Sequence, residues 1–471
     1  MLAEKRVDTQ KEQGAGPRPP VSSRSRQMLE GAPLPLLLRM AAPNAVAFLV
    51  QASVSMAEIA FVGQLGTVPL AALALMFPAL MLMQMLANGA VGGAVASAVA
   101  RAIGAGDRAK AQALIWHALV IAVLTGAGFL VAFGLGGERL LAAMGATPEV
   151  TAAAAGYAAL VFGGAPVLWI TALMSAAFRG MGNMRFPAAL MVGGAAVQVP
   201  LAGSLILGWF GLPRLGLDGA AAAVVAVAAV NGTILLWRLS RGHADLRLDV
   251  RSLGLHRRLF SDILRVGTLA ALSPVLTVLT IVMVNALVSD FGVAALAGYG
   301  IVARLEFLLI PMVFGLGAAM TAVVGVNVGA GNVARAERVA WLGGGCAAAL
   351  TGVVGLLLAL APELWLDLFT DDAAIFSAGE SYLRIVGPAF AFQGLGLSLY
   401  FASQGAGTVV WPVAATVLRF VIGVGGAAIG VYGLEHGLPA VYACLAAGML
   451  VYGAVTAVSI RLGAWRRRDS W

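Results

Sequence analysis

The sequence predicts an all-α membrane protein with about 12 transmembrane helices in two parallel six-helix lobes. Of its 471 residues, 60% are hydrophobic and only 11% are charged, whereas an average soluble domain has about 25% charged residues. Apolar runs of the length that a helix needs to cross a bilayer recur from Pro35 to Leu462. An internal repeat then divides these runs into two halves of equal helix number.

Hydropathy and the glycine and proline positions locate the individual helices. The predicted spans are 35–61, 69–100, 110–135, 151–178, 186–210, 217–238, 260–289, 295–327, 335–360, 377–403, 409–433 and 438–461. They give an N-terminal lobe over 34–238, a linker over 239–259 and a C-terminal lobe over 260–462.

Two polar tails flank the lobes, at 1–33 and 463–471. The first tail has no apolar core, so it is not expected to be a signal peptide. Its composition predicts a disordered cytoplasmic segment.

The repeat is clearest in two short segments that follow the second span of each lobe. Gly104–Ala111 reads GAGDRAKA and Gly329–Ala336 reads GAGNVARA, a shift of 225 residues. At the same shift, further glycine, proline and tyrosine positions coincide: Gly180 with Gly405, Gly182 with Gly407, Pro187 with Pro412 and Tyr157 with Tyr382. Because six helices separate the copies, both lobes are expected to insert in the same orientation, about an axis along the membrane normal.

The basic residues predict the orientation in the membrane. The net charge of +8 comes mainly from the two tails and from Arg238–Arg265, the pattern of cytoplasmic segments under the positive-inside rule rather than of nucleic-acid binding. Both termini are therefore expected in the cytoplasm, with the chain in a cell inner membrane. The remaining bases expected in cytoplasmic loops are Arg101, Arg108, Lys110, Arg179, Arg185, Arg335 and Arg338.

Glu58 is the main functional candidate. It is the only acid in the apolar run that begins at Pro35. A charged side chain at membrane depth costs about 2.5–3.5 kcal/mol on insertion scales, so such groups usually face a cavity and have a function there. Because desolvation favours the protonated form of a carboxyl group, we expect Glu58 to bind and release a proton in a transporter. The alternative is a hydrated carboxyl group near the outer interface with no role.

Other polar residues in the spans are candidates for a substrate cavity. Gln84 and Asn88 are four residues apart, with Met81 on the same stripe, so they could line a cavity or form an interhelical hydrogen bond. Glu306 could form an ion pair with Arg384 or Arg419, or act as a second proton site. The cysteines and histidines lack the spacing of metal ligands, so neither a metal nor a cofactor is expected.

Six segments together resemble the multidrug and toxic compound extrusion (MATE) family, over about residues 34–462. They are Glu58–Gly66, Leu70–Leu73, Gln84–Gly89, Gly104–Asp107, Gly325–Gly331 and Ser403–Gly407. The resemblance implies a MATE/MOP-type fold and an antiporter that expels organic, often cationic, compounds in exchange for protons or sodium.

Within the family the chain is similar to the DinF-type branch. That branch has an acid in its first helix at the position of Glu58. Pro43 matches the proline near which this helix is proposed to bend, which makes it a candidate hinge. Phe61 and Gln198 would then join the cavity candidates.

The coupling ion follows from where the chain departs from the family. Some members pair the first-helix acid with an asparagine and an aspartate in the fifth helix and a threonine in the sixth. Here these positions align with Gln198, Ala202 and Val224. A sodium ion needs several oxygen ligands, whereas a proton needs one basic atom, so proton coupling is favoured over sodium coupling.

The sequence therefore predicts a monomeric secondary efflux transporter in a lipid bilayer that exchanges protons for cationic or amphipathic organic compounds by alternating access. No paired acids or histidine clusters suggest an enzyme. The alternative is a lipid-linked precursor flippase of the same superfamily. Its polyanionic substrate would need a cavity lined by basic residues, for which Arg304, Arg384 and Arg419 are the candidates.

Overall fold

The computed structural model describes residues 23–242, 246 and 254–466. The first lobe contains α3 (Pro33–Gly63), α4 (Thr67–Met85), η1 (Leu86–Ala90), α5 (Val91–Gly104), α6 (Arg108–Ala143), α7 (Pro148–Gly163), α8 (Ala165–Gly180), α9 (Arg185–Leu207), η2 (Trp209–Gly211) and α10 (Leu217–Ser240). The second contains α11 (Arg257–Ser289), α12 (Val293–Gly329), α13 (Val333–Leu360), α14 (Glu363–Leu366), α15 (Ala373–Val386), η4 (Gly387–Ala389), α16 (Phe390–Ala406), α17 (Val410–Phe420), η5 (Val421–Gly425), α18 (Gly426–Ala428), η6 (Ile429–Gly433) and α19 (Leu438–Arg461).

The helices confirm the predicted number of spans. Among the described residues, 11 helical segments are long and apolar enough to cross a membrane, and α7 with α8 makes a twelfth. These two helices meet at Gly164 with a bend of 45°. Pro166, in the first turn of α8, lacks the N–H that would continue the hydrogen bonding of α7, which explains the break.

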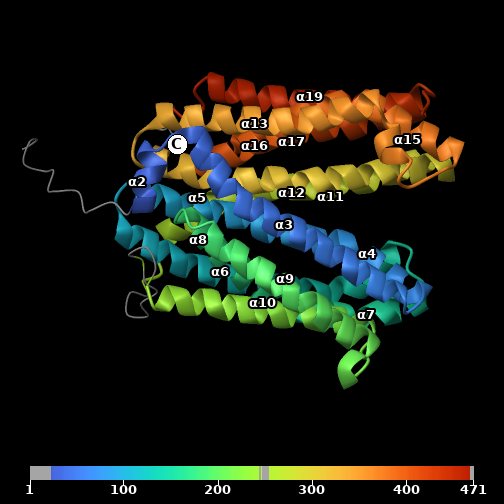
Figure 1. Cartoon of the computed structure of the whole chain (residues 1–471), viewed down its shortest axis with the longest axis horizontal. Coiled ribbons are helices and arrows are strands. Elements are labelled where there is room, and N and C mark those ends of the chain that lie inside the picture. Colours follow the sequence, from blue (N-terminus) through green and yellow to red (C-terminus); the bar gives the residue numbers. More distant parts are fainter. Residues whose placement is uncertain (1–22, 243–245, 247–253, 467–471) are drawn as a thin grey trace, which may run out of the picture.

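The lobes lie side by side (Figure 1), and α3, α5, α11, α12 and α16 are among the helices that make contacts across them. α3 packs against α9 of its own lobe and against α12 of the other, and α12 also packs against α5. Any group on α3, α5 or α12 can thus lie between the lobes.

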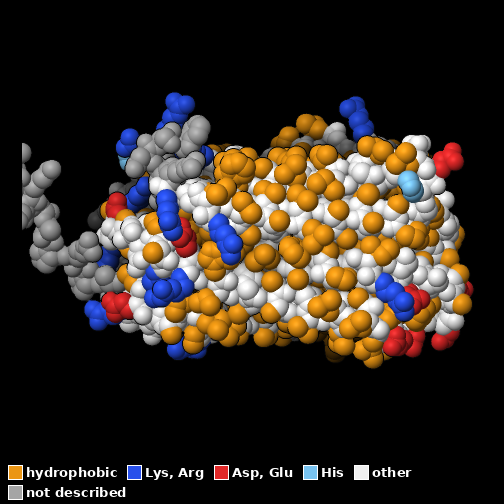
Figure 2. Space-filling view, turned by 90° about the horizontal axis from the view of Figure 1, so that it is seen from above, with side chains coloured by type: hydrophobic (Ala, Val, Ile, Leu, Met, Phe, Trp, Pro, Cys, Tyr) orange, Lys and Arg blue, Asp and Glu red, His pale blue; other side chains and the backbone are white. Residues whose placement is uncertain are grey.

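The surface is that of a multi-pass membrane protein. Figure 2 shows a wide band of hydrophobic side chains, with most charged side chains at the two ends of the molecule. Large apolar side chains in the middle of spans are exposed, among them Leu124 at 64% and Val353 at 65%. Lipid contact explains this exposure, which would be unfavourable in water.

Glycines bring the lobes into backbone contact at the end where α5 and α12 terminate. A Cβ atom on Gly104 would lie closer than 3.0 Å to the carbonyl oxygen of Val326, and one on Gly329 would lie equally close to that of Arg101. The two contacts are related by the 225-residue repeat. Neither glycine can carry a side chain without separating the two helices.

The same end is closed within each lobe by a second pair of glycines. Gly180 of α8 packs on the backbone of Ala96, and Gly405 of α16 packs on that of Thr321. We refer to Gly104, Gly180, Gly329 and Gly405 together as the glycine seal. The repeat predicted from the sequence therefore corresponds to a pseudo-two-fold arrangement of close helix contacts.

The first tail is partly ordered, which corrects the prediction of a disordered segment over 1–33. Residues 1–22 lie outside the described residues, but Ser23–Glu30 forms helix α2. Met28 is 1% exposed, and its backbone carbonyl accepts a hydrogen bond from Asn327 Nδ2 at 3.0 Å. The Met28 thioether also fills the space beside Gly182 of the first lobe. The side chain and the backbone carbonyl of Met28 thus contact the two lobes from a polar segment.

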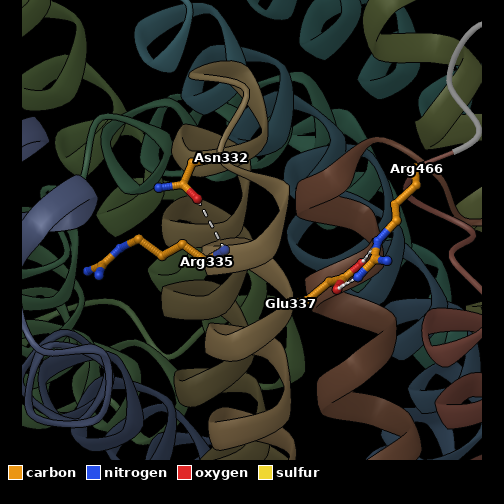
Figure 3. Close-up of polar contacts among 4 residues, drawn as sticks. All are labelled: Asn332, Arg335, Glu337 and Arg466. Carbon is orange, nitrogen blue, oxygen red and sulfur yellow. Dashed lines mark hydrogen bonds and ion pairs between the residues drawn. The ribbon is translucent and has the colours of Figure 1, made fainter.

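Repeat-related caps start the third span of each lobe. Asp107 Oδ1 accepts a hydrogen bond from Lys110 N at 2.8 Å, and Asn332 Oδ1 accepts one from Arg335 N at 3.2 Å (Figure 3). Both caps satisfy a free N–H group at the start of a helix.

The C-terminal tail is anchored by an ion pair near the same end. Arg466 Nε donates to Glu337 Oε1 at 2.9 Å (Figure 3), and this hydrogen bond raises the pKa of the guanidinium group. Trp465 is also buried, at 3% exposure. The described part of 463–471 therefore packs on the second lobe, and residues 467–471 lie outside the described residues.

The start of the second lobe is tied to the first. Residues 243–245 and 247–253 of the predicted linker lie outside the described residues. After them, His256 N donates to His117 Nε2 at 2.9 Å, and Lys110 forms an ion pair with Asp262 at 2.6 Å. Both contacts join α11 or its N-cap to α6.

Candidate functional site

Glu58 and Gln198 meet between α3 and α9. Gln198 Nε2 donates a hydrogen bond to Glu58 Oε1 at 2.8 Å. Gln198 is 6% exposed and Glu58 is partly exposed. Among the described residues, no base forms an ion pair with Glu58. The structure thus brings together two of the residues predicted for the site and keeps the carboxyl group without a permanent counter-charge.

The surroundings of this pair are aromatic and apolar. The ring of Phe61, one turn after Glu58, makes an edge contact with Trp209 at a centroid distance of 5.4 Å. Ala202, one turn after Gln198 on α9, is fully buried. Position 202 therefore contributes no side-chain oxygen beside the carboxyl group, as the departure from the family motif predicted.

A tyrosine accompanies a carboxyl group in each lobe. Tyr157 of α7 lies near enough to Glu58 for their charges to interact, and its repeat partner Tyr382 donates a hydrogen bond to Glu306 Oε1. The two tyrosines are equivalent by the repeat, but the acids are not, since Glu58 lies on α3 and Glu306 on α12. The second lobe thus has its own acid–tyrosine pair on a different helix.

The predicted ion pair between Glu306 and Arg384 is wrong. Arg384 Nη2 pairs at 2.7 Å with Glu380, one turn earlier on the same helix, where the helix geometry already places the two side chains together. Arg419 lies over the ring of Tyr452 at 5.8 Å rather than in an ion pair with Glu306. Glu306 is instead held by Tyr382.

Glu306 lines a cavity in the second lobe with an empty volume of about 350 Å³. Its other lining residues are Leu309, Ile310, Val313, Thr351, Phe390, Gln393, Gly394 and Leu397. None of the three arginines that a flippase would use lines it. Arg304 lies over the ring of Phe369 at 5.7 Å and is exposed.

A second cavity lies between the lobes, with an empty volume of about 340 Å³. It is lined by Phe48, Asn88, Gly93, Ala96, Arg179, Phe314, Ala318, Thr321 and Phe401. Asn88, one of the candidates for a substrate cavity, is among the lining residues. Gln84 is exposed, and neither it nor Met81 lines this cavity; the π-helical turn η1 lies between Gln84 and the rest of the span.

Arg179 is the residue that the sequence reasoning missed. It was assigned to a cytoplasmic loop, but it lies in the last turn of α8 and is 5% exposed. The repeat contained the signal, because the shift of 225 places Arg179 on Gln404, inside one of the family-like segments. Gln404 is fully buried between the lobes.

The proposed hinge does not interrupt the helix in this structure. α3 is one helix from Pro33 to Gly63 and continues through Pro43. A hinge role for Pro43 therefore stays a prediction about another conformation.

A comparison with protein families decides the wider identity of the chain. The model of the family MatE matches residues 43–203 and 270–429, together more than half of the chain. The chain belongs to the MatE family. The two matched segments are of nearly equal length and fall one in each lobe, in agreement with the internal repeat.

Individual relatives of this MATE protein are distant but cover most of it. The FAD transporter of Shewanella oneidensis is 26% identical over 78% of this chain and 81% of its own, and the probable multidrug resistance protein YoeA of Bacillus subtilis is 25% identical over 75% and 77%. A solved MOP superfamily transporter from Pyrococcus furiosus, described by the reversed polarity of its binding pocket, is 25% identical with a TM-score of 0.87. It covers 95% of this chain and 100% of its own.

These matches confirm the predicted MATE resemblance and the MATE/MOP-type fold. The family consists of multidrug efflux transporters rather than enzymes, and the many apolar helices make this member a multi-pass membrane protein.

Proposed function

We propose that this MATE protein is a proton-coupled antiporter that exports cationic or amphipathic organic compounds, with Glu58 as the proton-binding group. The observation that carries the proposal is the hydrogen bond between Glu58 and Gln198 in a site without a counter-charge among the described residues. An ionised carboxylate there attracts a cationic substrate, and protonation removes that attraction. One group can therefore bind either a proton or a substrate cation, which is the requirement for exchange.

Gln198 suits both states of the carboxyl group. Its amide N–H donates to the ionised carboxylate, and its amide oxygen can accept a hydrogen bond from the protonated acid. The pair can thus remain in contact through the cycle, while the electrostatic attraction for a cation changes. Ala202 offers no further ligand for sodium, so the donor set supports a proton as the coupling ion.

Export requires the lobes to expose this site to the two sides of the membrane alternately. The positive-inside pattern supports a cell inner membrane with both termini in the cytoplasm. The glycine seal lies near α2 and would then close the cytoplasmic side in the present conformation. We further propose that the protein acts as a monomer and uses no cofactor besides the transported proton.

The proposal is tested with Glu58→Gln in the full-length protein, reconstituted into proteoliposomes that hold a pH-sensitive dye. An organic cation such as ethidium is added on one side, and proton movement and dye transport are both recorded. Wild type should exchange the two, and Glu58→Gln should lose both activities by tenfold or more. Glu149→Gln, at an exposed acid in the first turn of α7, is the matched control and should behave as wild type.

Two outcomes would contradict the proposal. Full exchange by the Glu58→Gln variant would show that another group binds the proton. Exchange that requires sodium at constant pH, with choline as the comparison ion, would replace the proton by sodium.

A further inference from the structure

The cavity between the lobes contains an arginine that has no partner of its own. Arg179 is 5% exposed and lines this cavity. Within the described part of the chain, no acid lies within ion-pair distance of it and no aromatic ring lies under its guanidinium group. A buried charge without a partner costs several kcal/mol, so such groups are normally paired.

The repeat suggests why Arg179 has no partner among the described residues. Gln404, the repeat partner of Arg179, donates to the carbonyl oxygens of Gly89 and Ala90, both at 3.0 Å. These carbonyls belong to the π-helical turn η1, where the regular helical pattern is interrupted. The corresponding part of α12 is an uninterrupted α-helix, whose carbonyl oxygens are used within the helix.

The packing around Gln404 differs from that around Arg179, although Gly93 and its repeat partner Ala318 both line the cavity. A side chain on Gly93 would overlap the amide of Gln404, so that site is full. Its repeat partner Ala318 lines the cavity together with Arg179. Arg179 therefore faces open space, whereas the amide of its repeat partner Gln404 is packed tightly against Gly93.

The other residues that line the cavity indicate which ligands it could bind. Asn88 Nδ2 uses one N–H on the carbonyl of Gln84, which leaves a second N–H available. Phe48, Phe314 and Phe401 form a chain of edge contacts, with centroids 6.0 Å and 4.8 Å apart. A guanidinium group and an amide N–H suit an oxyanion, and the rings suit a flat aromatic group.

We propose that this cavity binds the acid group of an aromatic carboxylate or phosphate, with Arg179 and Asn88 on the oxygens and the phenylalanine rings around the aromatic part. The proposal deepens the proposed function and rests on it, because it names one substrate class: aromatic acids, including those that also carry a cationic group for Glu58. The site lies between the lobes, so binding there can respond to their movement.

The binding test uses the purified full-length protein and isothermal titration calorimetry. Benzoate and phenyl phosphate are the anionic probes, and benzamide is the neutral probe of matched shape. Wild type should bind at least one anion more tightly than benzamide, and Arg179→Gln should weaken that binding by about tenfold or more, as for a hydrogen bond to a charged group. Arg179→Lys keeps the positive charge but lacks the planar guanidinium group, so its affinity for the anion should lie between those of wild type and Arg179→Gln.

Two further variants distinguish a loss of binding from a loss of folding. Arg384→Gln removes an arginine outside the cavity and should leave anion binding unchanged. Ala318→Leu fills the cavity without touching the charge and should also abolish binding, with a thermal unfolding midpoint near that of wild type. Equal anion binding in wild type and Arg179→Gln, or binding of both benzoate and phenyl phosphate to wild type no tighter than that of benzamide, would overturn the proposal.

Transport separates this proposal from the proposed function. Arg179→Gln should lose export of a labelled aromatic acid but retain proton-driven export of ethidium, whereas Glu58→Gln should lose the proton coupling and retain calorimetric binding of benzoate. Displacement of benzoate from wild type by micellar phosphatidylglycerol, without displacement by soluble phenyl phosphate, would assign the site to a lipid headgroup and reject the aromatic acid.

Discussion

Glu306 and Tyr382 show how a buried acid is held by a hydrogen bond rather than by an ion pair. The tyrosine hydroxyl donates to the carboxyl group across 76 residues of sequence, and Tyr382 is 1% exposed. Removing one partner of a buried hydrogen bond leaves the other unsatisfied, which costs about 1–3 kcal/mol. Tyr382→Phe should therefore lower the thermal unfolding midpoint of the purified protein.

The repeat provides a matched control for this prediction. Tyr157 is the equivalent tyrosine of the first lobe, and no hydrogen bond to Glu58 is formed by it among the described contacts. Tyr157→Phe should change the midpoint by much less than Tyr382→Phe. Adding Glu306→Gln to Tyr382→Phe should lower the unfolding midpoint only a little further. If the effects of the two substitutions on the midpoint were additive, Tyr382 and Glu306 would not be coupled.

The sequence predicted some of these residues and not others, for a physical reason. Glu58 was found because a lone acid in an apolar run is costly wherever the run folds. The partner of Glu306 was assigned wrongly and the burial of Arg179 was missed, because both depend on contacts between helices distant in sequence. An arginine in the last turn of a span has the same local sequence whether it faces water or a neighbouring lobe.

At the scale of elements, Met28 is the most buried side chain of α2, so a substitution there should weaken the docking of the helix. Full burial of a methionine contributes about 1.5–3 kcal/mol, and an aspartate at the same place would be an unpaired buried charge. Met28→Asp should release α2 and allow it to unfold, so that trypsin cleaves faster after Arg24 and Arg26, whose side chains are already exposed. Mass spectrometry of the fragments over time measures the cleavage at these two sites.

Gln27→Asp is the control for that experiment, since Gln27 is exposed on the same helix. It should leave the rate of cleavage at Arg24 and Arg26 close to that of wild type. If Met28→Asp were cleaved no faster than Gln27→Asp, the packing of α2 would not depend on the methionine.

Most spans were predictable to within a few residues because their length and hydropathy are fixed by the bilayer, although α6 continues to Ala143, well beyond the predicted end at 135. The predicted span 151–178 nevertheless consists of two helices, α7 and α8, that meet at Gly164. Gly163, Gly164 and Pro166 mark this break in the sequence. Hydropathy alone could not show it, because both helices remain apolar.

At the scale of the whole molecule, adding even one methyl group to a glycine of the glycine seal should disturb the contact between helices at the closed end. A side chain on Gly329 would meet the backbone of Arg101, which cannot move without shifting α5. Gly329→Val should therefore favour conformations in which the lobes are separated at this end. Spin labels on Ala109 and Ala334, with Cys346 and Cys444 replaced by serine, should report longer distances by double electron–electron resonance.

The control substitution is Gly345→Val on α13, where a Cβ atom has open space around it. This variant should give the distance distribution of wild type. An unchanged distribution in Gly329→Val, with the protein still folded, would mean that the seal does not hold the lobes together.

The overall architecture was the most predictable level. The 225-residue shift gave the parallel arrangement of the lobes, and the same shift relates the close contacts of Gly104 and Gly329. What the repeat could not provide is where the halves differ. The cavity beside Arg179, the acid on α12 and the interrupted turn at Leu86–Ala90 all arise from such differences.

The docking of Met28 also has a consequence for biosynthesis. Its binding surface combines Gly182 with Asn327. The ribosome adds Asn327 to the chain about 300 residues after Met28. α2 therefore cannot reach its final position until most of the polypeptide has been translated and inserted. The attachment of α2 would therefore be one of the last steps of assembly. In stalled nascent chains of increasing length, the length at which this segment becomes protected from protease would show when the two lobes first make contact.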